Sequence, residues 1–275
     1  MQLSNFFVKN SALREIGLNR FMYYENTLGR LVSPSVPHIY ILFIQDGHGY
    51  VNDQKFKAGD VCAYGFNMHP LFAELHNLTF LGIETEFHLF YQLTGLRPSV
   101  CQDVLVLEPK DPLTRLLNNQ LLYFPVKTWV SQLESYVINQ LTYHVKELDT
   151  RTERLIFSTN FILGKNLTGL ELLSQELDIS YRALQRDFSY LLGITPKIFQ
   201  SIHRVYQAAN YIRTTPLNEA AFLAGYSDQA HMNRDFKRFA GITPHQVNLT
   251  HKSDSKFYLQ LEASSDSRSG FIIPY

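Results

Sequence analysis

Apolar positions in the first hundred residues fall in short clusters that are separated by turn residues. The run His38–Ile44 is rich in β-branched and aromatic side chains, and the turn-forming stretch Asp46–Gly49 interrupts it. Further apolar segments lie at Leu78–Ile83 and Glu86–Leu93. Short apolar runs with regularly spaced turn signals are typical of β-sandwiches and small barrels. We therefore expect residues 1–108 to form a β-rich domain with a cupin-like sandwich or small-barrel fold.

The pattern changes to helical spacing near Pro112. Leucines then recur three and four residues apart, which places them on one face of a helix. A second amphipathic stretch runs from Trp129 to Val145, and a third is expected to start at a cap at Asp149 and to end at Gly164. We expect residues 109–165 to be a helical linker or dimerisation helices.

One phrase occurs twice in the last part of the chain. Arg186–Phe188 reads Arg-Asp-Phe and is followed after four residues by Gly193–Pro196, which reads Gly-Ile-Thr-Pro. Arg234–Phe236 and Gly241–Pro244 repeat both motifs at an offset of 48 residues. A fixed offset indicates a duplicated supersecondary unit. Each copy follows a short helical segment and a polar turn, so the sequence predicts two helix-turn-helix units.

The first copy shows how its second helix is expected to form. Ser180 is the predicted N-cap, because its side chain can accept a hydrogen bond from a free backbone N–H group. Leu184, Phe188 and Leu191 are spaced to make one buried stripe.

The second copy follows the same plan. Gly225 fits a turn that requires positive φ, and Ser227 is the predicted cap. Met232, Phe236 and Phe239 form the predicted buried stripe.

The opposite faces of these helices carry side chains that read base edges in the major groove. Arg makes bidentate contacts to guanine, Gln makes them to adenine, and Ala fits against a thymine methyl group. Asp187 and Asp235 lie beside this face and either point aside or weaken phosphate contacts. The candidate DNA-binding residues are Arg182, Gln185, Arg186, Gln229, Ala230, His231, Asn233, Arg234 and Lys237.

A long amphipathic helix is expected between the two copies, with Thr195 as its cap and Pro196 as its first residue. It would hold the two recognition helices at a fixed separation. Two successive major grooves on one face of B-DNA lie about 34 Å apart.

Charge gives little support for nucleic-acid binding by itself. The formal net charge of the chain is zero, and residues 166–250 contain eight Lys/Arg and seven Asp/Glu. Affinity from counterion release is therefore limited, and base contacts or dimerisation must contribute. A plain helical bundle with solvated arginines, belonging to a non-DNA-binding interaction protein, stays an alternative. Two units in register, each with caps and a buried stripe, favour DNA binding.

Other chemistries find little support in the sequence. A cupin-type enzyme is a second alternative, but metal-dependent cupins use closely spaced His and Glu ligands, and the nearest approach here is Glu74 and His76. A DNA-repair alkyltransferase needs an activated thiolate and a cysteine-bound zinc, whereas Cys62 and Cys101 stand alone. We expect no metal, no cofactor and no catalytic residues.

No uncharged apolar run reaches the roughly 18 residues that span a bilayer. The first residues lack a basic region followed by an apolar one. We expect a cytoplasmic protein without a membrane partner.

The segment from Leu170 to Val247, 78 residues in length, resembles the DNA-binding domain of AraC/XylS-type bacterial transcription regulators. The residues that carry the resemblance are Ser180–Phe188, Gly193–Pro196, Ala224–His231, Phe236–Arg238 and Gly241–Pro244. The first part of the chain resembles, more weakly, the β-rich domains that precede this module in one branch of the family.

The resemblance implies a regulator that binds double-stranded DNA and contacts RNA polymerase. It also implies that the β-rich domain senses a small-molecule effector or forms a homodimer, and it leaves activation or repression open. The expected class is α+β, with residues 1–108 as the sensor or dimerisation domain and 109–165 as the linker. Residues 166–250 would be the double helix-turn-helix domain and residues 251–275 a polar tail.

Overall fold

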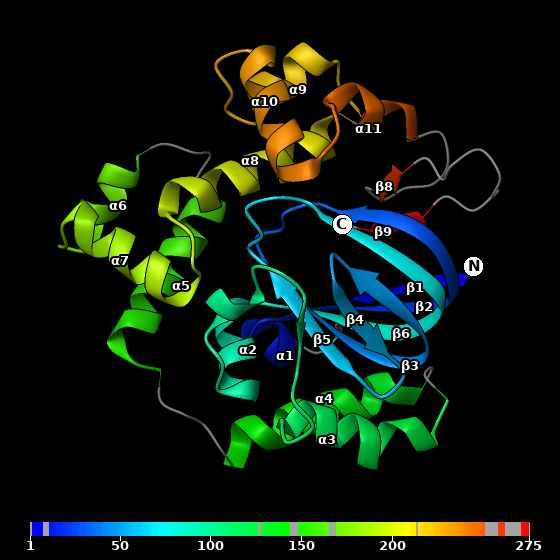
Figure 1. The fold of residues 1–275 in the computed structure, drawn as a ribbon. Helices are drawn as coiled ribbons and strands as arrows, with labels where there is room; N and C mark the ends of the chain where they lie inside the picture. Colours follow the sequence, from blue (N-terminus) through cyan, green and yellow to red (C-terminus); the bar gives the residue numbers. More distant parts are fainter. Residues whose placement is uncertain are drawn as a thin grey trace. The chain divides into compact units, whose positions relative to one another are not determined.

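A computed structural model gives the fold of the chain (Figure 1). It describes residues 2–7, 11–125, 128–143, 148–164, 169–212, 214–250, 258–261 and 271–274. The contacts between residues divide the chain into two compact units. The first unit comprises residues 1–29, 38–65 and 73–147, and the second comprises residues 30–37, 66–72 and 148–275.

A seven-stranded sheet dominates the first half of the chain. Its strands are β1 (Gln2–Phe7), β2 (Leu18–Ser33), β3 (Ile39–Val51), β4 (Gln54–Lys57), β5 (Val61–Gly65), β6 (Leu71–Thr85) and β7 (Leu105–Val106). The strand order is β1-β2-β6-β3-β5-β7, and β4 pairs with β3 at the side of this path. β3 pairs antiparallel with β4, β5 and β6. The predicted β-rich character of this region is confirmed.

The expected turn at Asp46–Gly49 is wrong, because β3 continues through it to Val51. The sequence signal instead marks two irregularities in the β3–β6 pairing, one on each side of Asp46. Gly47 has a φ of 79°, and a Cβ atom there would lie 2.3 Å from the Asn77 carbonyl oxygen. The bulged backbone therefore requires glycine at this position.

Helices accompany the sheet in the first unit. They are α1 (Ser11–Glu15), α2 (Phe87–Thr94), the 3-10 turn η1 (Pro98–Cys101), α3 (Pro112–Asn119), the 3-10 turn η2 (Leu121–Tyr123) and α4 (Trp129–Tyr143). The apolar segment Glu86–Leu93, grouped above with the expected strands, is α2. An apolar run of this length fits a buried helix as well as a strand, and Phe87, Leu89, Phe90 and Leu93 are all buried.

α3 begins where the sequence pattern changes to helical spacing. Asp111 is its N-cap and accepts a hydrogen bond of 2.9 Å from the Leu113 N–H group, and Pro112 is the first helical residue. The core of the first unit holds the fully buried side chains Tyr40, Phe43 and Trp129.

Seven helices are described in the second unit. They are α5 (Thr150–Gly164), α6 (Leu170–Glu176), α7 (Tyr181–Leu191), α8 (Pro196–Tyr211), α9 (Leu217–Leu223), α10 (Gln229–Ala240) and α11 (Pro244–Thr250). α5 begins after Asp149, whose Oδ1 accepts a hydrogen bond from the Thr152 N–H group, and it ends at Gly164, as the sequence predicts. The predicted α+β class is confirmed.

The division into units splits the expected helical linker. α3 and α4 belong with the sheet, whereas α5 belongs with the two helix-turn-helix units. In the last 25 residues, β8 (Tyr258–Leu261) and β9 (Phe271–Pro274) pair antiparallel, and the rest of the expected polar tail lies outside the described residues. None of the helices described is both long and apolar enough to cross a membrane.

Candidate nucleic-acid interface

The first recognition helix, α7, forms as the sequence predicts. Ser180 has extended backbone angles, and its Oγ accepts a hydrogen bond of 3.2 Å from the Ala183 N–H group. Leu184, Phe188 and Leu191 are buried along one face. Because this face is fixed in the core, the opposite face of the helix is turned to solvent.

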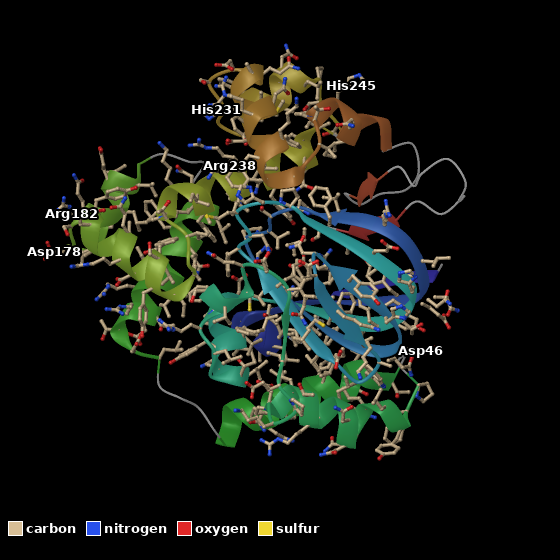
Figure 2. All side chains as sticks on the ribbon, in the orientation of Figure 1. Asp46, Asp178, Arg182, His231, Arg238 and His245 are labelled. Carbon is tan, nitrogen blue, oxygen red and sulfur yellow. The ribbon has the colours of Figure 1, made fainter. Side chains whose placement is uncertain are left out.

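Three candidate residues lie on that solvent face of α7. Arg182 and Arg186 are exposed, and Gln185 between them is half-buried. Arg182 is labelled in Figure 2, where it projects from α7. The helix therefore presents two guanidinium groups one turn apart, with an amide group beside them.

The second recognition helix, α10, has a different cap from the one predicted. The cap is Asp228, whose Oδ1 accepts a hydrogen bond of 2.7 Å from the His231 N–H group. This hydrogen bond lowers the pKa of Asp228 below its usual value. Ser227 instead donates from its Oγ to Asp228 Oδ2 at 3.1 Å. A carboxylate is the better cap here because it also interacts favourably with the positive end of the helix dipole.

The buried stripe of α10 is confirmed, since Met232, Phe236 and Phe239 are fully buried. The six candidate residues of this helix all reach its surface. Gln229, Ala230, Arg234 and Lys237 are exposed, whereas His231 and Asn233 are half-buried.

The His231 side chain is held by its neighbours on α10 and in the preceding turn. Its ring meets the Tyr226 ring edge-on at a centroid distance of 5.1 Å. Its Nδ1 lies 3.3 Å from Ser227 Oγ, and its Nε2 lies 4.0 Å from Asp235 Oδ2. These contacts fix the ring at the beginning of the helix, where it is still half exposed.

α8 connects the two helix-turn-helix units. Thr195 Oγ1 accepts a hydrogen bond of 3.3 Å from the Ile198 N–H group, and Pro196 is the first helical residue, as expected. The 16 residues of α8 span about 24 Å at 1.5 Å per residue. Near its start, the Phe199 ring contacts the Phe188 ring of α7, with 5.8 Å between their centroids. α8 also packs against α9 and α10.

Comparison with known proteins agrees with this geometry. The family model described as a helix-turn-helix domain matches residues 173–249, which include both recognition helices. Residues 173–249 are an AraC-type helix-turn-helix domain.

Curated relatives match the chain over part of their length. The HTH-type transcriptional regulator VirS of Mycobacterium tuberculosis is 31% identical over 99 residues, which are 35% of this chain and 29% of VirS. The chain thus spans less than a third of that relative.

Solved structures with distant overall likeness include ToxT from Vibrio cholerae, with a TM-score of 0.49, 9% identity, and coverage of 92% of this chain and 98% of that one. A probable AraC family transcriptional regulator from Rhodopseudomonas palustris has a TM-score of 0.34 and 22% identity, and the match covers 37% of this chain and 99% of that one.

Two arginines that the sequence analysis did not single out contact the first recognition helix of the AraC-type domain. They are Arg151 and Arg154 of α5, and both form ion pairs with Asp187. Asp187 therefore points aside, away from the solvent face of α7, which decides between the two possibilities left open for it. The only sequence signal was that Arg151 and Arg154 lie three residues apart, and so on one helix face.

Asp235 occupies the corresponding position in the second copy, but its surroundings differ. It is half-buried, and burial raises its pKa. Its described ion pair is with His231 of the same helix, at 4.0 Å. The two copies of the Arg-Asp-Phe motif thus place Asp187 and Asp235 at equivalent positions of their helices, but the two carboxylates have different partners.

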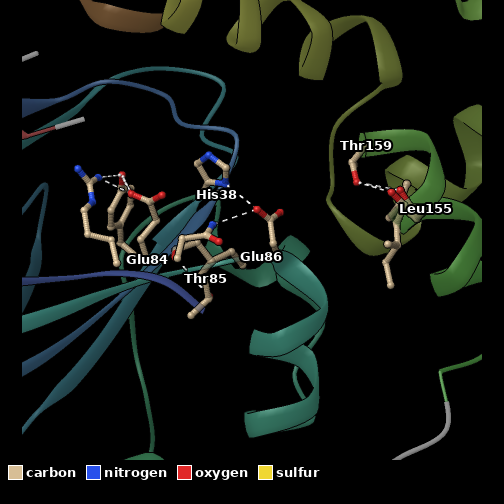
Figure 3. Close-up of polar contacts among 11 residues, drawn as sticks. His38, Glu84, Thr85, Glu86, Leu155 and Thr159 are labelled. Atoms are coloured by element: carbon tan, nitrogen blue, oxygen red, sulfur yellow. Dashed lines mark hydrogen bonds and ion pairs between the residues drawn. The ribbon is translucent and has the colours of Figure 1, made fainter. Parts of the chain in front are cut away.

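A separate polar cluster lies in the first unit. Figure 3 shows His38 directed at the Glu86 carboxylate, with 3.3 Å between Nδ1 and Oε1. Asn19 Nδ2 donates to the same oxygen at 3.0 Å. Nearby, the Tyr40 hydroxyl donates to Glu84 Oε2 at 2.8 Å, and Arg20 pairs with Glu84 as well. Arg20 and Glu84 are buried within the sheet, whereas His38 and Glu86 are half-buried and lie just before β3 and just after β6.

Glu74 and His76, the nearest approach to a metal motif, form an ion pair of 3.4 Å on β6. The His76 ring stacks on the ring of His48, with centroids 4.7 Å apart. Among the residues that the structure describes, His, Cys, Asp and Glu side chains form no group of three that could hold a metal ion.

Proposed function

We propose that this chain is a sequence-specific DNA-binding transcription regulator whose two recognition helices enter adjacent major grooves. The observation that carries the proposal is the outward face of α7 and α10 within an AraC-type domain. Each helix buries an apolar stripe and exposes Arg, Gln or Lys side chains. These are the side chains that hydrogen-bond to base edges and phosphates.

The contacts are proposed residue by residue. Arg182, Gln185 and Arg186 of α7 would contact the first groove. In the second groove the contacts would come from α10, through Gln229, Ala230, His231, Asn233, Arg234 and Lys237.

The proposed control of binding lies in the first unit. A small-molecule effector or homodimerisation would shift the population of DNA-binding conformations. RNA polymerase would be the second macromolecular partner, and the proposed role is non-enzymatic and cytoplasmic. Residues 1–108, 109–165 and 166–250 are the proposed sensor, linker and DNA-binding segments.

The first test is selection of DNA fragments by the purified full chain from a genomic or random-sequence pool, scored by gel shift at physiological salt with non-specific competitor DNA. The proposal expects an asymmetric site with two sequence blocks about one helical turn apart. Selection that enriches no common sequence would contradict it.

Two substitutions in α7 then test the assignment of individual contacts. Loss of a base contact, expected for Gln185→Ala, should cost about 1–3 kcal/mol and relax one position of the selected site. Loss of a phosphate contact weakens binding to all sequences alike and lowers the salt dependence. Arg186→Ala should show one of these two patterns. The matched control is Arg14→Ala, at an exposed arginine of α1 in the first unit, which should leave affinity unchanged. If neither α7 variant changes affinity, α7 does not contact DNA.

A further inference from the structure

Asp187 is an acidic residue on the first recognition helix, and two arginines of α5 bind its carboxylate. Only 4% of the residue is exposed. Arg154 Nε and one of its terminal nitrogens lie 3.1 and 2.7 Å from Oδ2, and Arg151 Nε lies 3.0 Å from Oδ1. Both carboxylate oxygens are thus bound by guanidinium groups. We call Asp187, Arg151 and Arg154 the Asp187 cluster.

The α5 arginines contact α7 at two positions, Asp187 and Tyr190, which lie nearly one helical turn apart. The Arg151 guanidinium also lies over the Tyr190 ring, 4.5 Å from its centroid. Tyr190 is three residues beyond Asp187, and therefore on the same side of α7. A planar guanidinium that pairs with a carboxylate and stacks on an aromatic ring fixes both distance and rotation. α5 therefore constrains how α7 is rotated about its own axis.

The charge of Asp187 matters because a recognition helix must approach the phosphates of DNA. Its neighbour Arg186 is exposed and points to the solvent face. The ion pairs described for Asp187 all go to α5, and none goes to Arg182 or Arg186. The α5 arginines thus neutralise the acid while the α7 arginines remain available. A buried carboxylate that loses its partners keeps an uncompensated charge.

We propose that Arg151 and Arg154 are positioning residues of the first recognition helix. They neutralise Asp187 and set the rotation of α7 about its own axis. α5 thereby contributes to DNA binding. This inference rests on the proposed function. It extends the functional module to a helix that precedes residues 173–249, where the family model matches. DNA recognition by the first recognition helix then depends on side chains that need not touch DNA.

A competing explanation is direct phosphate contact by the same arginines. The side chains of Arg151 and Arg154 are 42% and 32% exposed, so each could reach a phosphate. The two explanations differ in one respect. If the arginines act through Asp187, removal of the Asp187 charge should compensate for their loss, and if they bind phosphate it should not.

The experiment is a double-mutant cycle in the full chain, with a DNA fragment that the wild type selects from a random pool. One variant combines Arg151→Gln and Arg154→Gln, which removes the charges and keeps the aliphatic stems. The second is Asp187→Asn, and the third combines all three changes. We expect the arginine variant to bind about tenfold more weakly, a size typical of coupling between contacting groups. The triple variant should recover part of this loss, because it no longer leaves a bare carboxylate beside the recognition face. Asp187→Asn alone loses the rotational constraint but leaves no bare carboxylate, so it should weaken binding less than the arginine variant does.

Two further readouts separate positioning from phosphate binding and from general loss of structure. Under the proposal the salt dependence of binding stays unchanged in the arginine variant, and the sequence preference relaxes in the block read by α7. A salt slope reduced by about one for each arginine lost, without recovery in the triple variant, would overturn the proposal. Asp235→Asn is the matched control, because it removes the corresponding acid of α10. In the arginine background it should restore nothing.

Failure of the proposed function has a different signature from failure of this inference. If the wild type selects no DNA, the thermal unfolding midpoints of the same variants still test the cluster. The arginine variant should then lower the midpoint more than the triple variant does, because only the former leaves a bare buried carboxylate. Additive effects of the arginine and Asp187 substitutions on the midpoint would overturn the inference without reference to DNA.

Discussion

His38 and Glu86 form a half-buried ion pair whose contribution to stability depends on pH. Burial alone would lower the pKa of His38, but the Glu86 carboxylate raises it to about 9. In the opposite sense, burial would raise the pKa of Glu86, but His38 and the Asn19 hydrogen bond hold it below its usual value. Glu84, Arg20 and His88 complete the charged or titratable groups around the pair.

The pair should make the first unit less stable in alkali. A histidine with a raised pKa in the folded state contributes fully below its unfolded pKa of about 6.5, and this contribution is lost as the pH rises through 9. We expect the free energy of unfolding to fall by about 1–3 kcal/mol between pH 6 and pH 9.5, as measured by denaturant titration.

Glu86→Gln should flatten this pH dependence, because it removes the carboxylate that keeps His38 protonated. His245→Gln is the control, since His245 is exposed and lies in the second unit. Equal stability of the wild type at both pH values would contradict the pairing.

At the scale of elements, each recognition helix depends on its buried phenylalanines. Phe236 of α10 is fully buried, whereas Phe222 of the neighbouring helix α9 is 79% exposed. Phe236→Ala should cost about 3–5 kcal/mol of stability, because it removes a large side chain and leaves a cavity. Phe222→Ala in the same helix-turn-helix unit should change stability by less than about 0.5 kcal/mol. Similar losses in thermal or denaturant unfolding would mean that the burial pattern of α10 is not the one described.

Local signals in the sequence were sufficient to predict most helices of the second unit. The caps at Ser180 and Thr195, the positive φ of Gly225 (74°) and the buried stripes of α7 and α10 follow from spacing and residue type. These features depend on neighbours within one or two turns, which is the range over which sequence patterns act. The cap of α10 was wrong by one residue because Ser227 and Asp228 are both good caps.

Contacts between segments far apart in the chain could not be predicted from the sequence. The ion pairs of Asp187 join residues 33 or more positions apart, and the bulge in β3 is defined by its pairing with β6. α2 could not be separated from a strand, because a short buried run has no exposed face to reveal its period. Which of the nine candidate residues contact DNA stays a prediction.

At the scale of the whole molecule, two compact units should unfold separately. We expect calorimetry of the full chain to show two transitions rather than one two-state transition. The variants above assign them. Glu86→Gln should lower only the transition of the first unit, and Phe236→Ala only that of the second. A single transition with equal calorimetric and van't Hoff enthalpies would show instead that the units unfold together.

The sequence contains two cysteines, Cys62 and Cys101, and both are fully buried in the first unit, where burial raises the pKa of each thiol. A thiol reagent attacks the exposed thiolate, so neither sulfur reacts until the surrounding structure opens. The two cysteines are thus built-in probes of opening in the first unit. The rate of alkylation under native conditions measures how often the structure around these cysteines in the first unit opens, while the second unit, which contains no cysteine, contributes no signal.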